Sequence, residues 1–294
     1  MKIRLGTRGS RLAMVQSEIV AALLRAAGHD VTLVPIVTEG DVRPIDMSAG
    51  EGVFVAAIAR SLLDGRIDIA VHSAKDIPLV EEPELVVAAY PQRADARDAL
   101  ITRAGGASLA SLPHGSTVGT DSPRRTGFLR AARPDLRVVA LHGNVDTRLW
   151  RLDEGTVDAL VVAAAGVDRL GFGERIDRRL EAAIVAPAPA QGALAIQAHR
   201  AGAGLVRVLR EIDAPDIRFA VEVEREVLRA TGGTCRAPVG ALAEVRGDAF
   251  ELLVAGVNSD GSDMRVERLT GVRGQAMRMA AEAGARLVAA VALR

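Results

Sequence analysis

The stretch KIRLGTRGSRLAMVQSEIVAALLRAAGHDVTLVPIV (residues 2–37) joins two strand-like runs through a glycine turn and a long amphipathic segment. Apolar residues recur at helical spacing from about Arg11 to Ala27, whereas residues 2–5 and 31–37 have the composition of strands. The alternation continues with a predicted helix from about Val53 to Leu63 and a strand at 67–72. Strands that alternate with helices predict an α/β domain with a largely parallel sheet.

A second copy of this alternation follows, which predicts more than one domain. Its strands are expected near residues 116–120, 137–141 and 159–164, and its helices begin at about Pro123 and Val145. A polar stretch at 91–99 and a proline-rich stretch at 186–193 predict two crossings between domains. The remainder predicts a helix at 216–230, strands at 251–257 and 265–270, and a closing helix from about Gln275.

Length and composition restrict the class of protein. A chain of 294 residues that is 49% hydrophobic has material for two or three ordinary domains. Lys+Arg and Asp+Glu number 37 each and aromatic residues make up only 2%, which argues against a nucleic-acid-binding protein. The N-terminus MKIRLGTRGSRL lacks the apolar core of a signal peptide, and the chain has no apolar run of membrane-spanning length. We therefore expect a cytoplasmic protein without a membrane partner.

Three predicted strands end in a glycine turn that opens a helix and carries arginine, at residues 5–10, 118–125 and 141–148. Ser10, Ser122 and Asn144 are placed to cap these helices, and Pro123 suits a first helical position. Helix N-termini attract anions, and guanidinium groups bind carboxylates or phosphates in a bidentate manner. Because the chain has no GxxxxGK[ST] loop, we expect a ligand with several negative charges other than a nucleoside triphosphate, bound by Arg8, Arg124, Arg125 and Arg148.

A fourth turn, AVHSAKDIP (70–78), places His72, Ser73, Lys75 and Asp76 directly after a buried strand. Open α/β sheets bind ligands at the carboxyl ends of their strands. One interpretation makes Lys75 and Asp76 a solvated ion pair, and the other gives the Asp76 carboxylate the task of stabilising positive charge or moving a proton. The remaining histidines lack metal-ligand spacing, so no metal site is predicted.

The single cysteine, Cys235, lies in a glycine-rich turn, ATGGTCRAPVGAL (230–242). A lone thiol is often an inert core residue, but one on such a loop can reach a ligand.

Six motifs together resemble the porphobilinogen deaminase (hydroxymethylbilane synthase) family: TRGSRLAMVQS (7–17), AVHSAKDIP (70–78), GTDSPRR (119–125), GNVDTRL (143–149), APAQGALAIQ (188–197) and GTCRAPVGA (233–241). The resemblance spans residue 3 to about 243, and the final fifty residues match only in length and coarse pattern.

This resemblance implies an α/β fold of three domains. The first two resemble the lobes of type II periplasmic binding proteins, and the chain crosses twice between them. The third is a small α+β domain that carries the cysteine. The expected boundaries are 1–94 with 190–211 for the first domain, 97–187 for the second and 214–294 for the third.

The resemblance also implies a transferase that assembles a dipyrromethane cofactor on Cys235 from its own substrate. Four porphobilinogen molecules are then added head to tail with loss of ammonia, and hydrolysis releases a linear tetrapyrrole, which a downstream cyclising enzyme would receive. Asp76 matches the catalytic aspartate, which would stabilise cationic intermediates. The cofactor would be held by Cys235, Ser73, Lys75, Thr120, Ser122, Arg124, Arg125, His142 and Arg148. The incoming substrate would be held by Arg8, Ser10, Gln16 and Arg169.

Three positions depart from the family pattern. His142 stands where the family has arginine, Asp121 replaces a serine or glycine, and Glu51 occupies a position where lysine or a small neutral residue is common. Each change makes the binding cleft less positive, and Arg4 and Arg43 are candidates to compensate.

Two other functions fit part of the sequence. A periplasmic-type binding protein would use the same lobes and anion-binding turns without chemistry, although it needs no domain that carries a thiol. A cysteine hydrolase would use Cys235 as nucleophile, but no histidine lies in an obviously paired motif.

Overall fold

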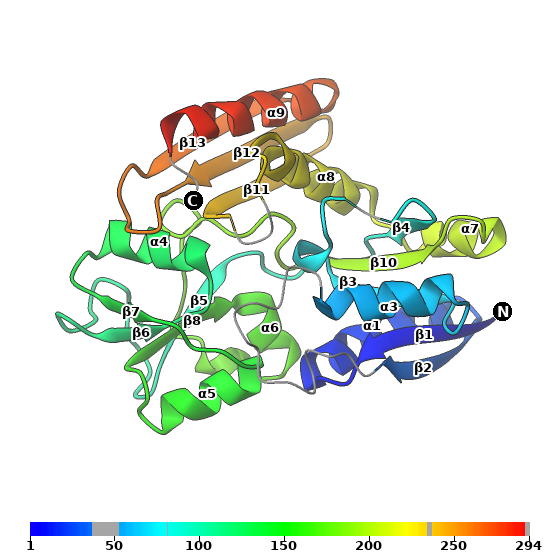
Figure 1. Cartoon of the computed structure of the whole chain (residues 1–294), viewed down its shortest axis with the longest axis horizontal. Coiled ribbons are helices and arrows are strands. Elements are labelled where there is room, and N and C mark those ends of the chain that lie inside the picture. Colours follow the sequence, from blue (N-terminus) through cyan, green and yellow to red (C-terminus); the bar gives the residue numbers. More distant parts are fainter. Residues whose placement is uncertain (37–52, 81, 234–236, 292–294) are drawn as a thin grey trace. The chain divides into compact units, whose positions relative to one another are not determined.

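The computed structural model describes residues 1–36, 53–80, 82–233 and 237–291, and it separates into two compact units (Figure 1). Unit 1 consists of Met1–Ala94 and Ala193–Arg218, and unit 2 consists of Asp95–Gly192 and Phe219–Arg294. Cys235, Glu51 and Arg43 lie outside the described residues. The division into three domains stays a prediction.

Unit 1 is built on a sheet with strand order β2-β1-β3-β10-β4. Its elements are β1 (Lys2–Arg8), α1 (Arg11–Ala26), β2 (Asp30–Ile36), α3 (Val53–Leu63), β3 (Ile69–Ser73), the short 3-10 helix η1 (Ala74–Asp76), β4 (Leu85–Ala89), β10 (Leu194–His199) and α7 (Ala203–Glu211). β1 pairs in parallel with both β2 and β3, while β10 runs antiparallel to β3 and β4.

Helices cover both faces of the unit 1 sheet. α1 buries Val20, Ala21 and Leu24, whose spacing places them on one stripe of the helix, against strand residues such as Leu5. On the opposite face, α3 contributes Ile58 and Leu62 to a second buried cluster with strand residues. Burial on both faces accounts for the nearly continuous apolar run of β3.

Unit 2 contains a sheet of the same design, with strand order β7-β6-β8-β5-β9. Its elements are β5 (Asp98–Thr102), β6 (Thr117–Gly119), α4 (Pro123–Ala132), β7 (Arg137–Val139), α5 (Val145–Asp153), β8 (Ala159–Ala163), α6 (Ala164–Arg169), the 3-10 helix η2 (Gly173–Arg175) and β9 (Arg178–Arg179). β6 pairs in parallel with β7 and β8, and β5 runs antiparallel to β8 and β9. One face packs against Phe128 and Leu129 of α4, and the other against Leu149 and Leu152 of α5.

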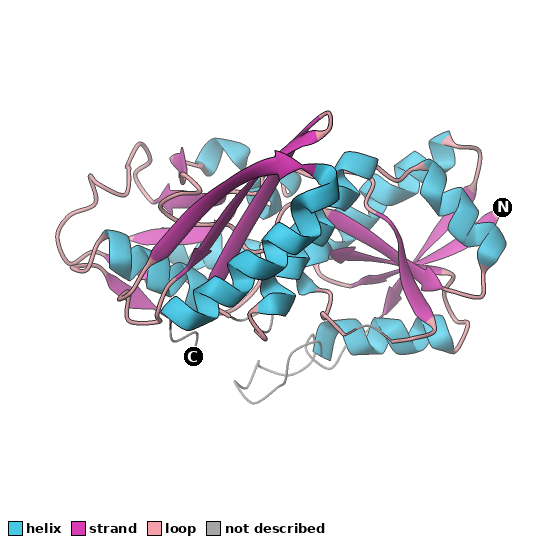
Figure 2. Cartoon of the chain, turned by 90° about the horizontal axis from the view of Figure 1, so that it is seen from above, coloured by secondary structure: helices cyan, strands magenta, loops and turns pink. Residues whose placement is uncertain are grey.

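Unit 2 also holds a three-stranded antiparallel sheet of β11 (Val239–Arg246), β12 (Ala249–Gly256) and β13 (Arg265–Val272). The long helix α9 (Arg273–Ala290) packs against β12 and β13 (Figures 1 and 2). α8 (Pro215–Ala230) begins in unit 1 and continues into unit 2. Within the described ranges, no helix combines the length and the apolar character needed to cross a membrane.

The mixed α/β class is confirmed. In each five-stranded sheet four strands share one direction and a single strand, β10 or β5, runs antiparallel to them, so the expectation of largely parallel sheets holds. The boundary between the two units, Ala94/Asp95, lies within the crossing predicted at 91–99, which also contains the start of β5 at Asp98.

Candidate active site

Two of the predicted turns, those after β1 and after β3, meet at one edge of the unit 1 sheet. β1 and β3 are parallel neighbours, so their carboxyl ends, Arg8 and Ser73, lie at the same edge. Ser10 is the N-cap of α1, and its hydroxyl accepts a hydrogen bond of 3.4 Å from the backbone N–H of Ala13, as predicted. Gln16, a buried residue of α1, donates from Nε2 to Oγ of Ser73 at 2.9 Å. This bond joins the turn after β1 to the turn after β3.

The turn after β3 presents the predicted catalytic aspartate to solvent. Ala74, Lys75 and Asp76 form η1, which closes with a 3.3 Å bond from the Ile77 N–H to the Ala74 carbonyl. Apolar residues on either side, Ala74 and Ile77, are buried, whereas Asp76 is exposed. The alternation explains how a polar residue follows a buried strand without being buried itself.

His72 differs from the other residues of this turn because it lies within β3 and is buried. Burial lowers the pKa of His72 to about 4, and the Gln197 side chain on β10 opposes this shift only in part. The imidazole is therefore neutral near neutral pH.

In unit 2, the turn between β6 and α4 holds Thr120 and Ser122, and the first turn of α4 holds Arg124 and Arg125. The Ser122 hydroxyl accepts from the Arg125 N–H at 3.4 Å, and Pro123 occupies the first helical turn, as predicted. Thr120 is buried, and its N–H donates to the Val139 carbonyl of β7 at 3.0 Å.

Arg124 and Arg125 share one buried carboxylate, that of Asp98 at the start of β5. Nη2 of Arg124 donates to Oδ2 at 2.8 Å, and Nε and Nη2 of Arg125 donate to Oδ1 at 3.1 and 2.8 Å. Burial alone would raise the pKa of Asp98, but both guanidinium groups hold it well below its usual range. The Gln191 side chain adds a 2.8 Å bond to Oδ1, and Arg124 also bonds the Ala186 carbonyl.

The turn between β7 and α5 holds His142, and the first turn of α5 holds Arg148. Nε of Arg148 donates to the Gly143 carbonyl at 2.7 Å. Asn144 is the N-cap of α5, as predicted, although its side chain makes no capping bond. The pKa of Arg148 is lowered to about 10, mainly by burial and also by the positive charges of Arg125 and Arg151, while Asp121 opposes the shift.

Two of the positions that depart from the family pattern contact each other. Nδ1 of His142 lies 2.9 Å from Oδ2 of Asp121, outside hydrogen-bonding alignment, and the contact is an ion pair only when the imidazole is protonated. The third, Glu51, is outside the described residues. Arg4 is held by Asp68 through two side-chain bonds of 3.1 and 2.7 Å.

Arg169 ends α6, and its Nη2 donates to the Gly192 carbonyl at 2.7 Å. Burial lowers its pKa to about 10, with Asp168 acting in the opposite direction. The predicted site residues thus form two groups, one in each unit. The unit 1 group consists of Arg8, Ser10, Gln16, Ser73, Lys75 and Asp76, and the unit 2 group consists of Thr120, Ser122, Arg124, Arg125, His142, Arg148 and Arg169.

Sequence reasoning missed two polar residues of the unit 2 group. Asp98 is fully buried, yet in the sequence it is one of several charges in a polar stretch, and nothing local distinguishes it. Gln191 lies inside the motif at 188–197, and its polar side chain among the apolar residues of that segment was the signal available.

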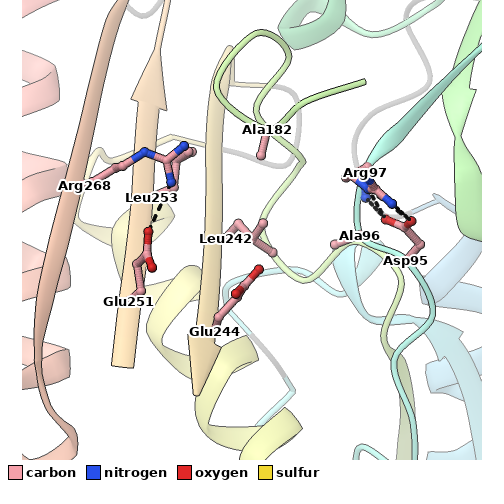
Figure 3. A pocket seen from close by; sticks show the side chains of 9 residues that line it. All are labelled: Asp95, Ala96, Arg97, Ala182, Leu242, Glu244, Glu251, Leu253 and Arg268. Carbon is pink, nitrogen blue, oxygen red and sulfur yellow. Dashed lines mark hydrogen bonds and ion pairs between the residues drawn. The ribbon is translucent and has the colours of Figure 1, made fainter. Parts of the chain in front are cut away.

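A cavity of about 600 Å³ lies elsewhere in unit 2, between the three-stranded sheet and the start of β5 (Figure 3). Charged pairs line it, with Asp95 bonded to Arg97 and Glu251 bonded to Arg268. None of the predicted site residues is among its lining residues, so it is separate from the candidate active site.

The unit 2 group suits a ligand that carries carboxylates. Around the two turns there are four guanidinium groups, those of Arg124, Arg125, Arg148 and Arg151, and three carboxylates, those of Asp98, Asp121 and Asp146. The lowered pKa of Arg148 reflects the cost of holding its charge there, and a ligand carboxylate would reduce that cost.

Comparisons with known proteins agree with this chemistry. A family model described as porphobilinogen deaminase, dipyromethane cofactor binding domain, matches residues 3–206, and one described as porphobilinogen deaminase, C-terminal domain, matches residues 218–291. A porphobilinogen deaminase from Acidothermus cellulolyticus is 47% identical over 276 residues, covering 92% of this chain and 83% of its own. One from Roseiflexus castenholzii is 46% identical, covering 87% and 85%. One from Mycobacterium ulcerans is 45% identical, covering 97% and 94%.

Among solved structures, the chain is similar to the second substrate binding domain of a putative amino acid ABC transporter from Streptococcus pneumoniae, with 14% identity and a TM-score of 0.47 over 79% of this chain and 95% of that one. The two family models together match nearly the whole sequence, and the relatives named above match it at 45–47% identity. This chain belongs to the porphobilinogen deaminase family.

Proposed function

We propose that this chain joins four porphobilinogen molecules head to tail into the linear tetrapyrrole hydroxymethylbilane, the transferase reaction of its family. In each addition the aminomethyl C–N bond of porphobilinogen breaks and ammonia leaves. A carbon–carbon bond then forms to the free α-carbon of the terminal pyrrole, which loses its proton. In the final step the carbon–carbon bond between the first-added methylene and its primer breaks: water supplies a hydroxyl to the methylene and a proton to the primer's α-carbon, which releases hydroxymethylbilane.

The observation that carries this proposal is the grouping of Arg8, Ser73 and Asp76 at one sheet edge in a chain of this family. An arginine and polar donors at that edge suit the acetate and propionate groups of porphobilinogen. The exposed carboxylate beside them suits the positive charge that develops as ammonia leaves. The bond between Gln16 and Ser73 supports this role because it fixes the two turns relative to each other.

We assign Asp76 the catalytic role. Positive charge develops on the substrate's methylene carbon and pyrrole N–H as the C–N bond breaks, and a fixed carboxylate lowers the energy of that state. The short helix η1 supports this assignment because its buried neighbours anchor a side chain that itself remains accessible.

We assign the remaining site residues to the carboxylates of the ligands. Arg8, Ser10, Gln16 and Arg169 serve the incoming substrate, while Ser73, Lys75, Thr120, Ser122, His142 and Arg148 serve the cofactor. Arg124 and Arg125 contribute positive charge to the same group, and their bonds to Asp98 fix where that charge lies.

The dipyrromethane cofactor, when bound, supplies the pyrrole α-carbon to which the first substrate is joined, and we assign its thioether link to Cys235. The family model that matches residues 3–206 describes a domain that binds this cofactor. The excess of guanidinium groups in unit 2 supports a group with four carboxylates.

The test is the intact mass of the recombinant protein. We expect a mass above that of the sequence by one dipyrromethane, and Cys235→Ser should lose the increment. The wild type should also release ammonia and tetrapyrrole from porphobilinogen. A wild type that shows only the sequence mass, and gains none when incubated with porphobilinogen, contradicts the proposal.

We further propose three domains within the boundaries predicted above, a cytoplasmic location, and delivery of the product to a downstream tetrapyrrole-cyclising enzyme. The separate three-stranded sheet of β11–β13 supports a third domain. The single cysteine supports a reducing compartment, because the thiol must remain reduced until it forms the thioether.

A further inference from the structure

Asp121 and His142 connect two turns of unit 2 that each contribute predicted ligand-binding residues. Asp121 lies between β6 and α4, His142 lies between β7 and α5, and β6 and β7 are parallel neighbours. Oδ2 of Asp121 is 2.9 Å from Nδ1 of His142, and the two side chains are 26% and 37% exposed. Both side chains are therefore partly exposed, although Nδ1 of His142 is itself buried against Asp121.

Asp121 also acts on a second cation of this group. Its negative charge favours the charged form of Arg148, against burial and against the positive charges of Arg125 and Arg151. Asp98, by contrast, is fully buried between Arg124 and Arg125. Asp121 is thus a partly exposed carboxylate close to two groups that would bind a ligand carboxylate.

We propose that Asp121 is an internal counter-ion that competes with ligand carboxylates for His142 and Arg148, and so sets how tightly this enzyme holds its anionic ligands. The inference rests on the proposed function, because it concerns the strength of ligand binding at that site. It assigns a specificity-determining role to a residue at which this chain differs from the family pattern.

The proposal makes the effects of residues 121 and 142 depend on each other. An arginine at position 142 would form a bidentate pair with Asp121, so it would gain little for a ligand. A serine at position 121 removes the competitor and leaves His142 and Arg148 to the ligand. With both changes, the new arginine has no internal partner and binds the ligand with its full strength.

The test is a double-mutant cycle on binding of a probe, propane-1,2,3-tricarboxylate, measured by calorimetry at fixed pH and ionic strength. Each full-length protein carries Cys235→Ser, so that no covalent cofactor fills the site. We expect Asp121→Ser to tighten binding about 3- to 10-fold and His142→Arg less than about 3-fold, on the scale of one charge-assisted hydrogen bond. The double variant should exceed the product of the two single effects by at least about 3-fold.

Two further variants separate this mechanism from a general charge effect. Asp153→Ser removes the same charge from an exposed pair with Arg175 and should change probe affinity less than about 2-fold. Asp121→Asn keeps the shape of the side chain without its charge and should behave like Asp121→Ser. Multiplicative single effects, weaker binding in Asp121→Ser, or a wild-type affinity in Asp121→Asn would each overturn the proposal.

The failure of this inference can be distinguished from failure of the proposed function. Probe binding requires no turnover. If the effects of residues 121 and 142 on probe affinity are coupled, the role of Asp121 is supported even if the wild type makes no tetrapyrrole. Conversely, normal turnover together with independent effects of the two residues refutes only the role of Asp121. In proteins that retain Cys235, the rate of mass gain on incubation with porphobilinogen should follow the same order as the probe affinities.

Discussion

Oδ2 of Asp98 accepts a 2.8 Å hydrogen bond from Nη2 of Arg124, and both side chains are almost completely buried. The other carboxylate oxygen binds Arg125 and Gln191, so a single aspartate joins β5, the first turn of α4 and residues 186–192. Ion pairs in such a position cost desolvation energy, and the cost is offset only while every partner is present. The position of two site arginines therefore depends on a residue that no ligand needs to touch.

Asp98→Asn should accordingly destabilise the protein strongly. The amide removes the negative charge that compensates two buried guanidinium groups, and the expected loss is about 3–5 kcal/mol in the free energy of unfolding. Urea titration at pH 7 measures it. Asp153→Asn is the matched control, because it breaks an exposed pair with Arg175 and should cost less than about 1 kcal/mol. Equal effects in the two variants would show that the buried network does not hold unit 2 together.

His72 should make the stability of the protein depend on pH below neutrality. Its pKa is lowered to about 4 by burial, so between pH 6.5 and 4 the unfolded chain binds a proton that the folded protein does not. Stability therefore falls as pH falls through that window.

Between pH 7.5 and 4.5, the unfolding free energy of the wild type should fall by roughly 2 to 3 kcal/mol more than that of His72→Gln. Denaturant titrations of both proteins at the two pH values check this. His114→Gln, at an exposed histidine, is the control and should follow the wild type. A wild-type profile parallel to that of His72→Gln would mean that His72 titrates alike in the folded and unfolded states.

Much of the fold follows from local patterns in the sequence. The helices at Arg11–Ala26 and Pro123–Ala132 have the amphipathic spacing or capping residues that define them, and they begin where the sequence predicts. The antiparallel insertion of β10 and β5 could not be predicted in this way. Each pairs with a strand distant along the chain, and a short apolar run is equally compatible with either direction.

The candidate site likewise contains features that local sequence patterns predict and features that depend on pairing between distant strands. The glycine turns, their arginines and Asp76 are recognisable because turn chemistry and the family motifs are local. The burial of Asp98 and the contact between Asp121 and His142 arise from pairing between strands, and the sequence contains no local signal for either. The contacts that these residues make were therefore visible only in the structure.

Glu224 should be required as a carboxylate in the interior of unit 2. It is a fully buried residue of α8, and its two oxygens accept 2.6 and 2.7 Å bonds from the N–H groups of Ala190 and Ala243. Ala190 has a φ of +65°, a backbone conformation that costs energy for a residue with a Cβ, so this bond helps to hold it.

In Glu224→Gln, the amide nitrogen would face one of the two N–H donors, and the unfolding free energy should fall by about 1–3 kcal/mol. Glu222→Gln changes an exposed residue of the same helix and should stay within about 0.5 kcal/mol of the wild type. If urea titration gives the two variants the same stability, the bonds of Glu224 contribute no net energy.

Asp76→Asn should separate catalysis from folding. Asp76 is exposed on η1 and helps neither to bury the strand before it nor to close the turn, which depends on the backbone bond between Ala74 and Ile77. The variant should therefore keep the wild-type thermal midpoint within about 1 °C. Turnover of porphobilinogen should fall by about 100-fold or more, since the amide cannot compensate the positive charge that develops as ammonia leaves. Because that charge is absent from the bound substrate, the loss should appear in kcat rather than in KM.

Asp64→Asn, at an exposed aspartate of the same unit that pairs with Arg66, is the matched control and should retain full activity. A variant that loses activity only through a raised KM would assign Asp76 to substrate binding, and near-normal kcat and KM would remove it from the mechanism.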